Sequence, residues 1–205
     1  MFSPDSKIMQ VFSRLADLVL LNILFLITSL PVFTIGAAVT ALYTMCFRLI
    51  REEYSGIIRS YFKAFRDNFK TATAAWLLVM LAAVPSLYYL SQTLLAEGFL
   101  RYTSLVFILI LTIVLMTASY GFPWISQFEN TAIQSLKNGL FLSISRLPRT
   151  AAVLVINLMP VIVWFISAEL FIQVSFLWVA LYFAAAAYMN TGLLWHVFKP
   201  YRNQS

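Results

Sequence analysis

Long apolar runs alternate with short basic segments along this chain. No charged residue occurs between Asp17 and Arg48, and further apolar stretches lie at 71–92, 103–124, 150–167 and 174–197. Each stretch is long enough to cross about 30 Å of hydrocarbon as a helix. The pattern therefore predicts an all-α, polytopic membrane helix bundle.

The first apolar stretch lies between two basic segments that should both face the cytoplasm, so an even number of crossings is expected between them. It also contains a helix breaker. Pro31 disfavours helix at Leu30, and Gly36 weakens the start of the second helix. We predict two short passes, 15–30 and 32–49, which bring the bundle to about six spans. A hairpin that dips into the bilayer without crossing fully fits the same pattern. One long helix kinked at the proline is the alternative.

Two connecting segments, 48–70 and 127–149, are basic and amphipathic. Apolar residues recur at helical spacing in the first and face cations on the opposite arc. We expect both segments to be cytoplasmic helices, the first with its aromatic side in the lipid. Its cations then contact the membrane surface or a partner protein: Arg59, Lys63, Arg66 and Lys70.

The cations are distributed unevenly among the loops. Both termini and the two amphipathic segments hold 13 of the 14 Lys and Arg residues, and only Arg101 lies elsewhere. Cytoplasmic loops of membrane proteins carry such an excess of cations. We therefore expect a multi-pass protein of the plasma membrane with both termini in the cytoplasm.

Composition excludes other classes. The chain is 61% hydrophobic and 11% charged, whereas soluble domains carry about 25% charged residues. Residues 1–205 thus form a single integral membrane domain whose partner is the lipid bilayer. The net charge of +6 is explained by the cytoplasmic loops and does not indicate nucleic acid. The one cysteine, Cys46, excludes a disulfide framework.

Residues that could carry chemistry are few. No phosphate-binding glycine loop, zinc-protease motif, nucleophile elbow or CxxC pair occurs, so we expect no catalytic, cofactor-binding or metal-binding residues and no enzyme activity. Three amides lie inside predicted spans, and each either bonds neighbouring helices or lines a polar pathway: Asn22, Asn157 and Asn190.

Two patterns concern packing and internal symmetry. Gly36, Thr40 and Thr44 recur every four residues, and small residues at this spacing let helices approach closely. Residues 33–92 and 104–170 share the order span, glutamate, amphipathic helix, span. That order suggests a parallel repeat related by an axis along the membrane normal.

The segment LADLVLLNILFLITSLPVFTIGAAVTALYTMCFRL, followed by SYFKAFRDNFKTAT, resembles the YesL-like family of small membrane proteins from Gram-positive bacteria. The resemblance covers roughly the first eighty residues. It implies a protein often encoded beside carbohydrate-binding and ABC-type sugar uptake components. We therefore expect a non-enzymatic accessory to carbohydrate uptake, with sugar-uptake transporter components as partners. The alternative is a small transporter or permease subunit in its own right.

Overall fold

The computed structural model describes residues 7–53 and 56–202, and these are helical apart from short connections. Tyr54 lies outside the described residues, as do the side chains of Lys7 and Arg202. No strand occurs in the described part. In chain order the elements are α1 (Lys7–Ser29), η1 (Val32–Thr34), α2 (Ile35–Arg51), α3 (Ile57–Leu94), α4 (Phe99–Tyr102), α5 (Ser104–Ile125), α6 (Ala132–Ser145), α7 (Leu147–Ile166), α8 (Ala168–Gln173), α9 (Ser175–Leu177), η2 (Trp178–Tyr182) and α10 (Phe183–Arg202).

The membrane-protein class is confirmed. Within the described residues, six helical segments are long and apolar enough to span a bilayer: Val11–Ser29, Val32–Arg51, Ile57–Leu94, Phe99–Ile125, Leu147–Ile166 and Ser175–Tyr201. Large apolar side chains on these segments are exposed, for example Leu81, Leu109 and Phe165. Such surfaces are stable when lipid covers them, since lipid tails are as apolar as these side chains.

The apolar stretch before Arg48 folds as two helices, α1 and α2, so the single kinked helix is excluded. Pro31 is extended (φ −75°, ψ 116°) and separates them. An Nη of Arg14, early in α1, lies 3.0 Å from Oε1 of Glu52, just after α2. The chain therefore returns to its starting end between these residues.

The turn of this hairpin has its carbonyl groups satisfied by side chains. Thr34 Oγ1 donates to the Thr28 carbonyl at 2.6 Å and to the Pro31 carbonyl at 2.7 Å. Trp76 Nε1, from α3, donates to the Val32 carbonyl at 2.8 Å. Irregular backbone within a membrane needs such partners because no water is present there.

The hairpin turn reaches only part of the way along α3. After Trp76, which bonds the turn, α3 continues from Leu77 to Leu94, about 27 Å at the rise of an α-helix. Leu30 is 80% exposed at the turn. The α1–α2 hairpin therefore lies beside the first part of α3, and the rest of α3 extends beyond the hairpin turn.

The first amphipathic segment is not a separate helix but the first part of α3. Nothing between Lys70 and Thr71 breaks the helix, so it continues into the apolar run. The aromatic stripe also differs from the expectation. Tyr61 is fully buried in the protein, with its hydroxyl 2.7 Å from Thr28 Oγ1. The α1–α2 hairpin covers this side, while Ile58 and Phe62 remain exposed.

The second amphipathic segment forms a separate helix, α6. A capping box of Thr131 and Gln134 begins it, and a non-helical Arg146 (φ −133°, ψ 46°) separates it from α7. A Cβ atom on Gly139 would lie 2.6 Å from the backbone nitrogen of Gly121 in α5, so α5 and α6 cross in close contact. In the predicted repeat, the separate helices α6 and α7 of the second unit correspond to the single continuous α3 of the first. The repeat stays a prediction.

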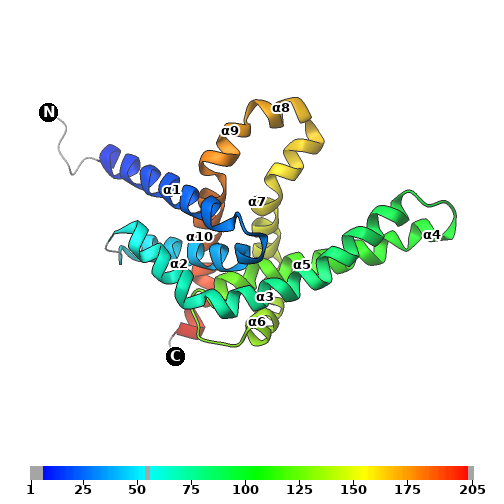
Figure 1. The fold of residues 1–205 in the computed structure, drawn as a ribbon, viewed down its shortest axis with the longest axis horizontal. Helices are drawn as coiled ribbons and strands as arrows, with labels where there is room; N and C mark the ends of the chain where they lie inside the picture. Colours follow the sequence, from blue (N-terminus) through cyan, green and yellow to red (C-terminus); the bar gives the residue numbers. More distant parts are fainter. Residues whose placement is uncertain (1–6, 54–55, 203–205) are drawn as a thin grey trace.

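Helix α2 forms the centre of the molecule and is the most buried of the six segments. Figure 1 shows α3 and α5 side by side in one arm that ends at α4, and α7 and α10 in a second arm joined by α8 and α9. An aromatic cluster ties α2, α5 and α10 together near their final turns: Phe47, Trp124, Phe128, Trp195, Phe198 and Tyr201.

Candidate functional site

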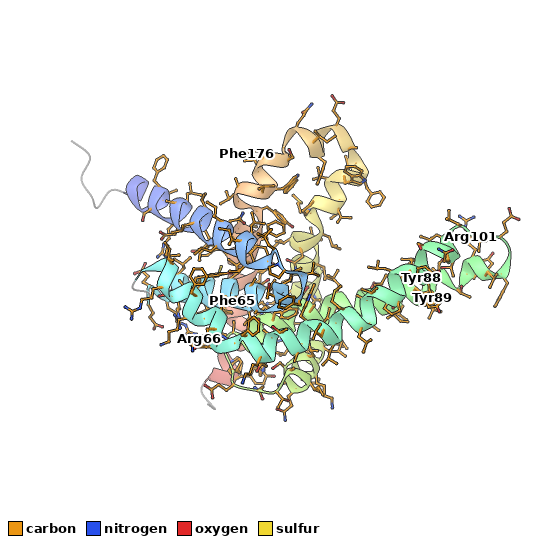
Figure 2. The ribbon with its side chains drawn as sticks, in the orientation of Figure 1. Phe65, Arg66, Tyr88, Tyr89, Arg101 and Phe176 are labelled. Atoms are coloured by element: carbon orange, nitrogen blue, oxygen red, sulfur yellow. The ribbon has the colours of Figure 1, made fainter. Side chains whose placement is uncertain are left out.

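Several basic segments meet at one end of the molecule, here called the basic end. Arg14 donates to the Leu49 carbonyl at 2.8 Å, and Arg51 donates to Gln127 Oε1 at 2.6 Å. The Arg51 guanidinium also lies 5.4 Å from the centre of the Trp195 ring. Figure 2 shows Arg101 far away, near the tip of the α3–α5 arm. The start of α1 and the ends of α2, α5 and α10 thus share one end.

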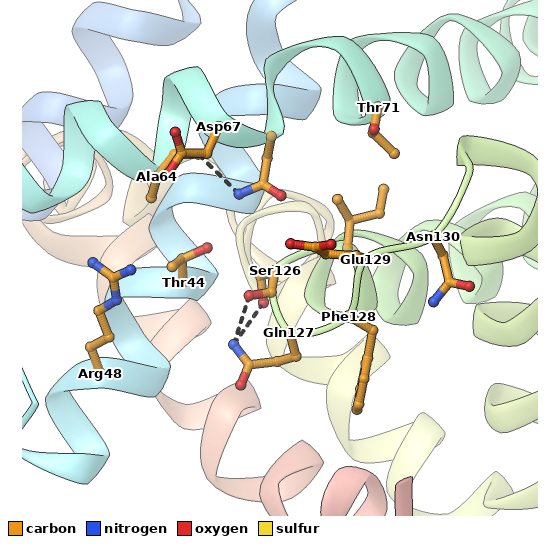
Figure 3. Close-up of a pocket in the computed structure, with 12 residues that line it drawn as sticks. Thr44, Arg48, Ala64, Asp67, Thr71, Ser126, Gln127, Phe128, Glu129 and Asn130 are labelled. Atoms are coloured by element: carbon orange, nitrogen blue, oxygen red, sulfur yellow. Dashed lines mark hydrogen bonds between the residues drawn. The ribbon is translucent and has the colours of Figure 1, made fainter. Parts of the chain in front are cut away.

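The basic end holds an open polar cleft between α2, α3 and the α5–α6 connection (Figure 3). Its cavity has a volume of about 380 Å³, within the usual range for small-ligand pockets. A second cavity of about 450 Å³ shares four of its residues, Thr44, Arg48, Ser126 and Gln127. The polar cleft is lined by Thr44, Arg48, Ala64, Asp67, Asn68, Thr71, Ile125, Ser126, Gln127, Phe128, Glu129 and Asn130.

Charges of both signs line the polar cleft without pairing with each other. In the described part of the chain the ion pairs are Arg14–Glu52 at 3.0 Å and Arg51–Glu53 at 3.7 Å. Arg48, Asp67 and Glu129 belong to neither pair. In Figure 3, Arg48 and Glu129 lie on either side of Ser126. The polar cleft therefore offers one guanidinium and two carboxylates to a ligand.

The four cations predicted to contact the membrane surface or a partner lie along the first half of α3, outside the polar cleft. Arg59, Lys63, Arg66 and Lys70 are all exposed. Figure 2 shows Arg66 pointing away from the protein. Tyr61 and Ala64 face the core from the same helix. The cations thus form a separate basic face beside the polar cleft.

Two of the three predicted intramembrane amides meet in one hydrogen-bond network. Asn190 Nδ2 donates to Asn157 Oδ1 at 2.7 Å and to the Tyr43 hydroxyl at 3.2 Å. Asn157 Nδ2 donates to Ser119 Oγ at 3.1 Å. The network joins α2, α5, α7 and α10. Asn190 is fully buried, and interhelical bonds of this kind are worth about 0.6 kcal/mol each.

The third amide, Asn22, lies apart and bonds the backbone of the last span. Its Nδ2 donates to the Val179 carbonyl at 2.5 Å, and its Oδ1 accepts from the Ala184 backbone nitrogen at 3.0 Å. Val179 lies within the π-helical segment η2 and Ala184 lies two residues after it, where the regular ladder of α-helical bonds is interrupted. Asn22 therefore supplies partners that the widened turn lacks.

The small residues of α2 serve different contacts. A Cβ atom on Gly36 would lie 2.5 Å from both the Ala72 carbonyl oxygen and Trp76 Cβ, so α2 and α3 pack at backbone distance here. Thr44 lines the polar cleft, and its hydroxyl donates to the Thr40 carbonyl at 2.9 Å. Thr40 is fully buried.

The sequence predicted no site at the acidic and amide residues of the polar cleft, and it singled out only Glu129, as the glutamate of the second unit of the predicted repeat. Asp67, Asn68, Glu129 and Asn130 lie beside apolar runs, where polar residues normally mark the membrane surface. Their convergence depends on the packing of α3 against the α5–α6 connection. In the described residues no group of three or more His, Cys, Asp or Glu could hold a metal ion.

Comparison with known proteins relates the first part of the chain to a family. Residues 18–89 match the family model described as a protein of unknown function, DUF624. The match runs from α1 through α2 into α3, so it includes Asn22, Gly36 and the basic face. No curated protein and no solved structure matches the chain.

Proposed function

We propose that this chain is a non-enzymatic accessory protein of the plasma membrane that assists ABC-type carbohydrate uptake by binding a transporter component. The YesL-like resemblance of the first eighty residues supports this assignment and implies a Gram-positive source. The proposal places the basic end and both termini in the cytoplasm, because cytoplasmic loops carry the excess of Lys and Arg.

One observation carries the proposal: amides inside the bundle, those of Asn157 and Asn190, bond to one another across helices, whereas the four cations of the basic face have their side chains exposed. Exposed charges steer and orient a partner of opposite charge. The partner we infer is therefore a cytoplasmic or membrane component with an acidic surface.

The test is co-purification in mild detergent after cross-linking in native membranes, read by mass spectrometry. The decisive variant replaces Arg59, Lys63, Arg66 and Lys70 with Gln. A matched control exchanges each Arg for Lys and each Lys for Arg, which keeps the charge. We expect the Gln variant to lose transporter components and the control to keep them.

Two results would contradict the proposal. One is recovery of the same components with both variants, since binding would then not depend on these charges. The other is contact between the basic face and lipid that disappears when anionic lipid is omitted, in samples where no protein partner is captured. That result would assign the basic face to the membrane surface. Purified protein in neutral lipid separates partner binding from lipid contact.

A second candidate function, a small transporter or permease subunit, is favoured by a cavity beside the intramembrane network. This cavity of about 260 Å³ lies between the two arms, and Tyr43, Ser119 and Asn157 contribute its polar wall. Solute uptake by the purified chain in liposomes would support this function. Asn157→Ala should then reduce uptake, and retention of full uptake would exclude the network from the pathway.

A further inference from the structure

The polar cleft lies where apolar helices become polar. On α3 its lining ends at Thr71, where the apolar run 71–92 begins, and on α2 it includes Arg48, the first charge after the apolar stretch. On α5 it begins at Ile125, the last helical residue. Three elements thus place the polar cleft at one boundary. In a bilayer that boundary is the headgroup layer.

The charges of the polar cleft match a ligand with two opposite charges. The Arg48 guanidinium is planar and has several N–H donors, which suits a phosphate. The carboxylates of Asp67 and Glu129 accept hydrogen bonds from an ammonium group. None of the three is ion-paired within the described residues. The Asn130 amide adds neutral donors and an acceptor, whereas the Gln127 amide is bonded to Arg51 and Ser126 and Asn68 Nδ2 is bonded to the Ala64 carbonyl.

We propose that the polar cleft binds the headgroup of an ethanolamine phospholipid, with its phosphate at Arg48 and its primary ammonium at Asp67 and Glu129. The location at the headgroup layer favours a lipid over a soluble zwitterion of the same chemistry. A choline headgroup fits less well because a quaternary ammonium donates no hydrogen bonds and prefers aromatic cages, and Phe128 is the one aromatic residue in this lining.

An anionic lipid is also disfavoured here. Two carboxylates face one guanidinium in the polar cleft, so a headgroup without a cation would leave Asp67 and Glu129 near its negative charge. The cations of the basic face on α3 lie outside the cleft, so they add no positive charge to its lining. Binding of an ethanolamine lipid in the polar cleft is separate from the proposed function, because it does not depend on a transporter partner.

The experiment measures lipid retained by the purified full chain after exchange into nanodiscs of equal ethanolamine, choline and glycerol phospholipid, using native mass spectrometry. Wild-type protein should retain the ethanolamine lipid preferentially. The double variant Asp67→Asn, Glu129→Gln should lose the preference for ethanolamine over choline, and Arg48→Gln should weaken binding of both lipids. Loss of a charge-assisted hydrogen bond should weaken affinity on the order of tenfold.

The control changes charges at the opposite end of the molecule. Glu97→Gln with Arg101→Gln, around α4, removes one charge of each sign far from the polar cleft and should leave the lipid preference unchanged. Thermal unfolding of each variant in detergent identifies any that fails to fold, and Arg48→Lys then replaces Arg48→Gln as the milder test. Equal lipid preference in the wild type and the carboxylate variant would overturn the proposal.

Soluble phosphoethanolamine provides the arm that distinguishes the source of the ligand. Added to protein in choline-lipid nanodiscs, it should bind more weakly than the lipid, because its headgroup is not held at the bilayer surface. Binding of phosphoethanolamine without enrichment of the ethanolamine lipid would overturn the lipid assignment.

Discussion

Because Gly36 has no side-chain carbon, α2 can approach the backbone of α3 closely at this position. We predict that Gly36→Ala destabilises the protein by about 1–3 kcal/mol, because the added Cβ would lie 2.5 Å from the Ala72 carbonyl oxygen and from Trp76 Cβ. Gly192→Ala in α10 is the matched control, since apart from the adjacent residues and backbone of its own helix no atom lies within 4 Å of its added Cβ. Thermal unfolding in one detergent measures both.

The control separates crowding from helix propensity. Alanine is better than glycine in a helix by up to about 1 kcal/mol, so Gly192→Ala should keep or raise the unfolding temperature. Both glycines lie in helices, and the propensity gain is shared. Equal unfolding temperatures for the two variants would show that α2 and α3 do not pack at backbone distance.

Asn22 illustrates what a residue alone does not reveal. The sequence identified it as a polar residue inside an apolar run, and two roles stayed open. Its partners are the backbone groups of Val179 and Ala184, separated from it in sequence by 157 and 162 residues. No local sequence pattern around Asn22 predicts that it will bond a π-helical segment so far along the chain. Only the packing of α1 against the last span shows which groups Asn22 bonds.

At the scale of elements, the α1–α2 hairpin depends on one threonine in its turn. We predict that Thr34→Val lowers stability by roughly 1–2 kcal/mol, because the Thr28 carbonyl loses the hydroxyl that lies 2.6 Å away. Valine has nearly the same shape, so the loss reports the hydrogen bond. The measurement is thermal unfolding, together with hydrogen exchange of the amides at 30–35, which should become faster.

The control for this variant is Thr112→Val in α5. The Thr112 hydroxyl donates only to the Ile108 carbonyl of its own helix, at 2.8 Å, and is exposed. Its removal should change stability little, since that carbonyl keeps its helical bond. Similar losses of stability for Thr34→Val and Thr112→Val would mean that the Thr28 carbonyl does not need the Thr34 hydroxyl, because water reaches the turn.

Helix α3 shows where element boundaries were misplaced. The period of its first half predicted an amphipathic helix and the next run predicted a span, and both helical assignments hold for Ile57–Leu94. The sequence contains no breaker at Lys70, so one helix serves both parts. The break after α6 had a local cause, since Pro148 has no backbone N–H to continue the bonds of α6 and lies instead in the first turn of α7, where no such donor is needed.

At the scale of the whole molecule, the orientation in the membrane is the main prediction. Fusion of alkaline phosphatase after Ser205 should be inactive and fusion of a fluorescent protein there should be bright, because we expect the basic end, with its excess of Lys and Arg, to lie in the cytoplasm. A phosphatase inserted within 95–99 should be active, since this segment lies at the tip of the arm that carries Arg101. An active phosphatase at Ser205 would reverse the orientation.

The sequence alone determined that the chain is a helical membrane protein and which runs form its spans, because hydrophobic length and local breakers are local properties. It also indicated that the cations of the loops share one end, since spans alternate in direction. The tertiary structure decided which polar groups meet. Tyr61 is buried only because the hairpin covers it, and the polar cleft exists only because Arg48, Asp67 and Glu129 converge from three separate segments. These contacts join residues far apart in sequence, and helical periodicity indicates which face of a helix is apolar but not which other helix will pack against it.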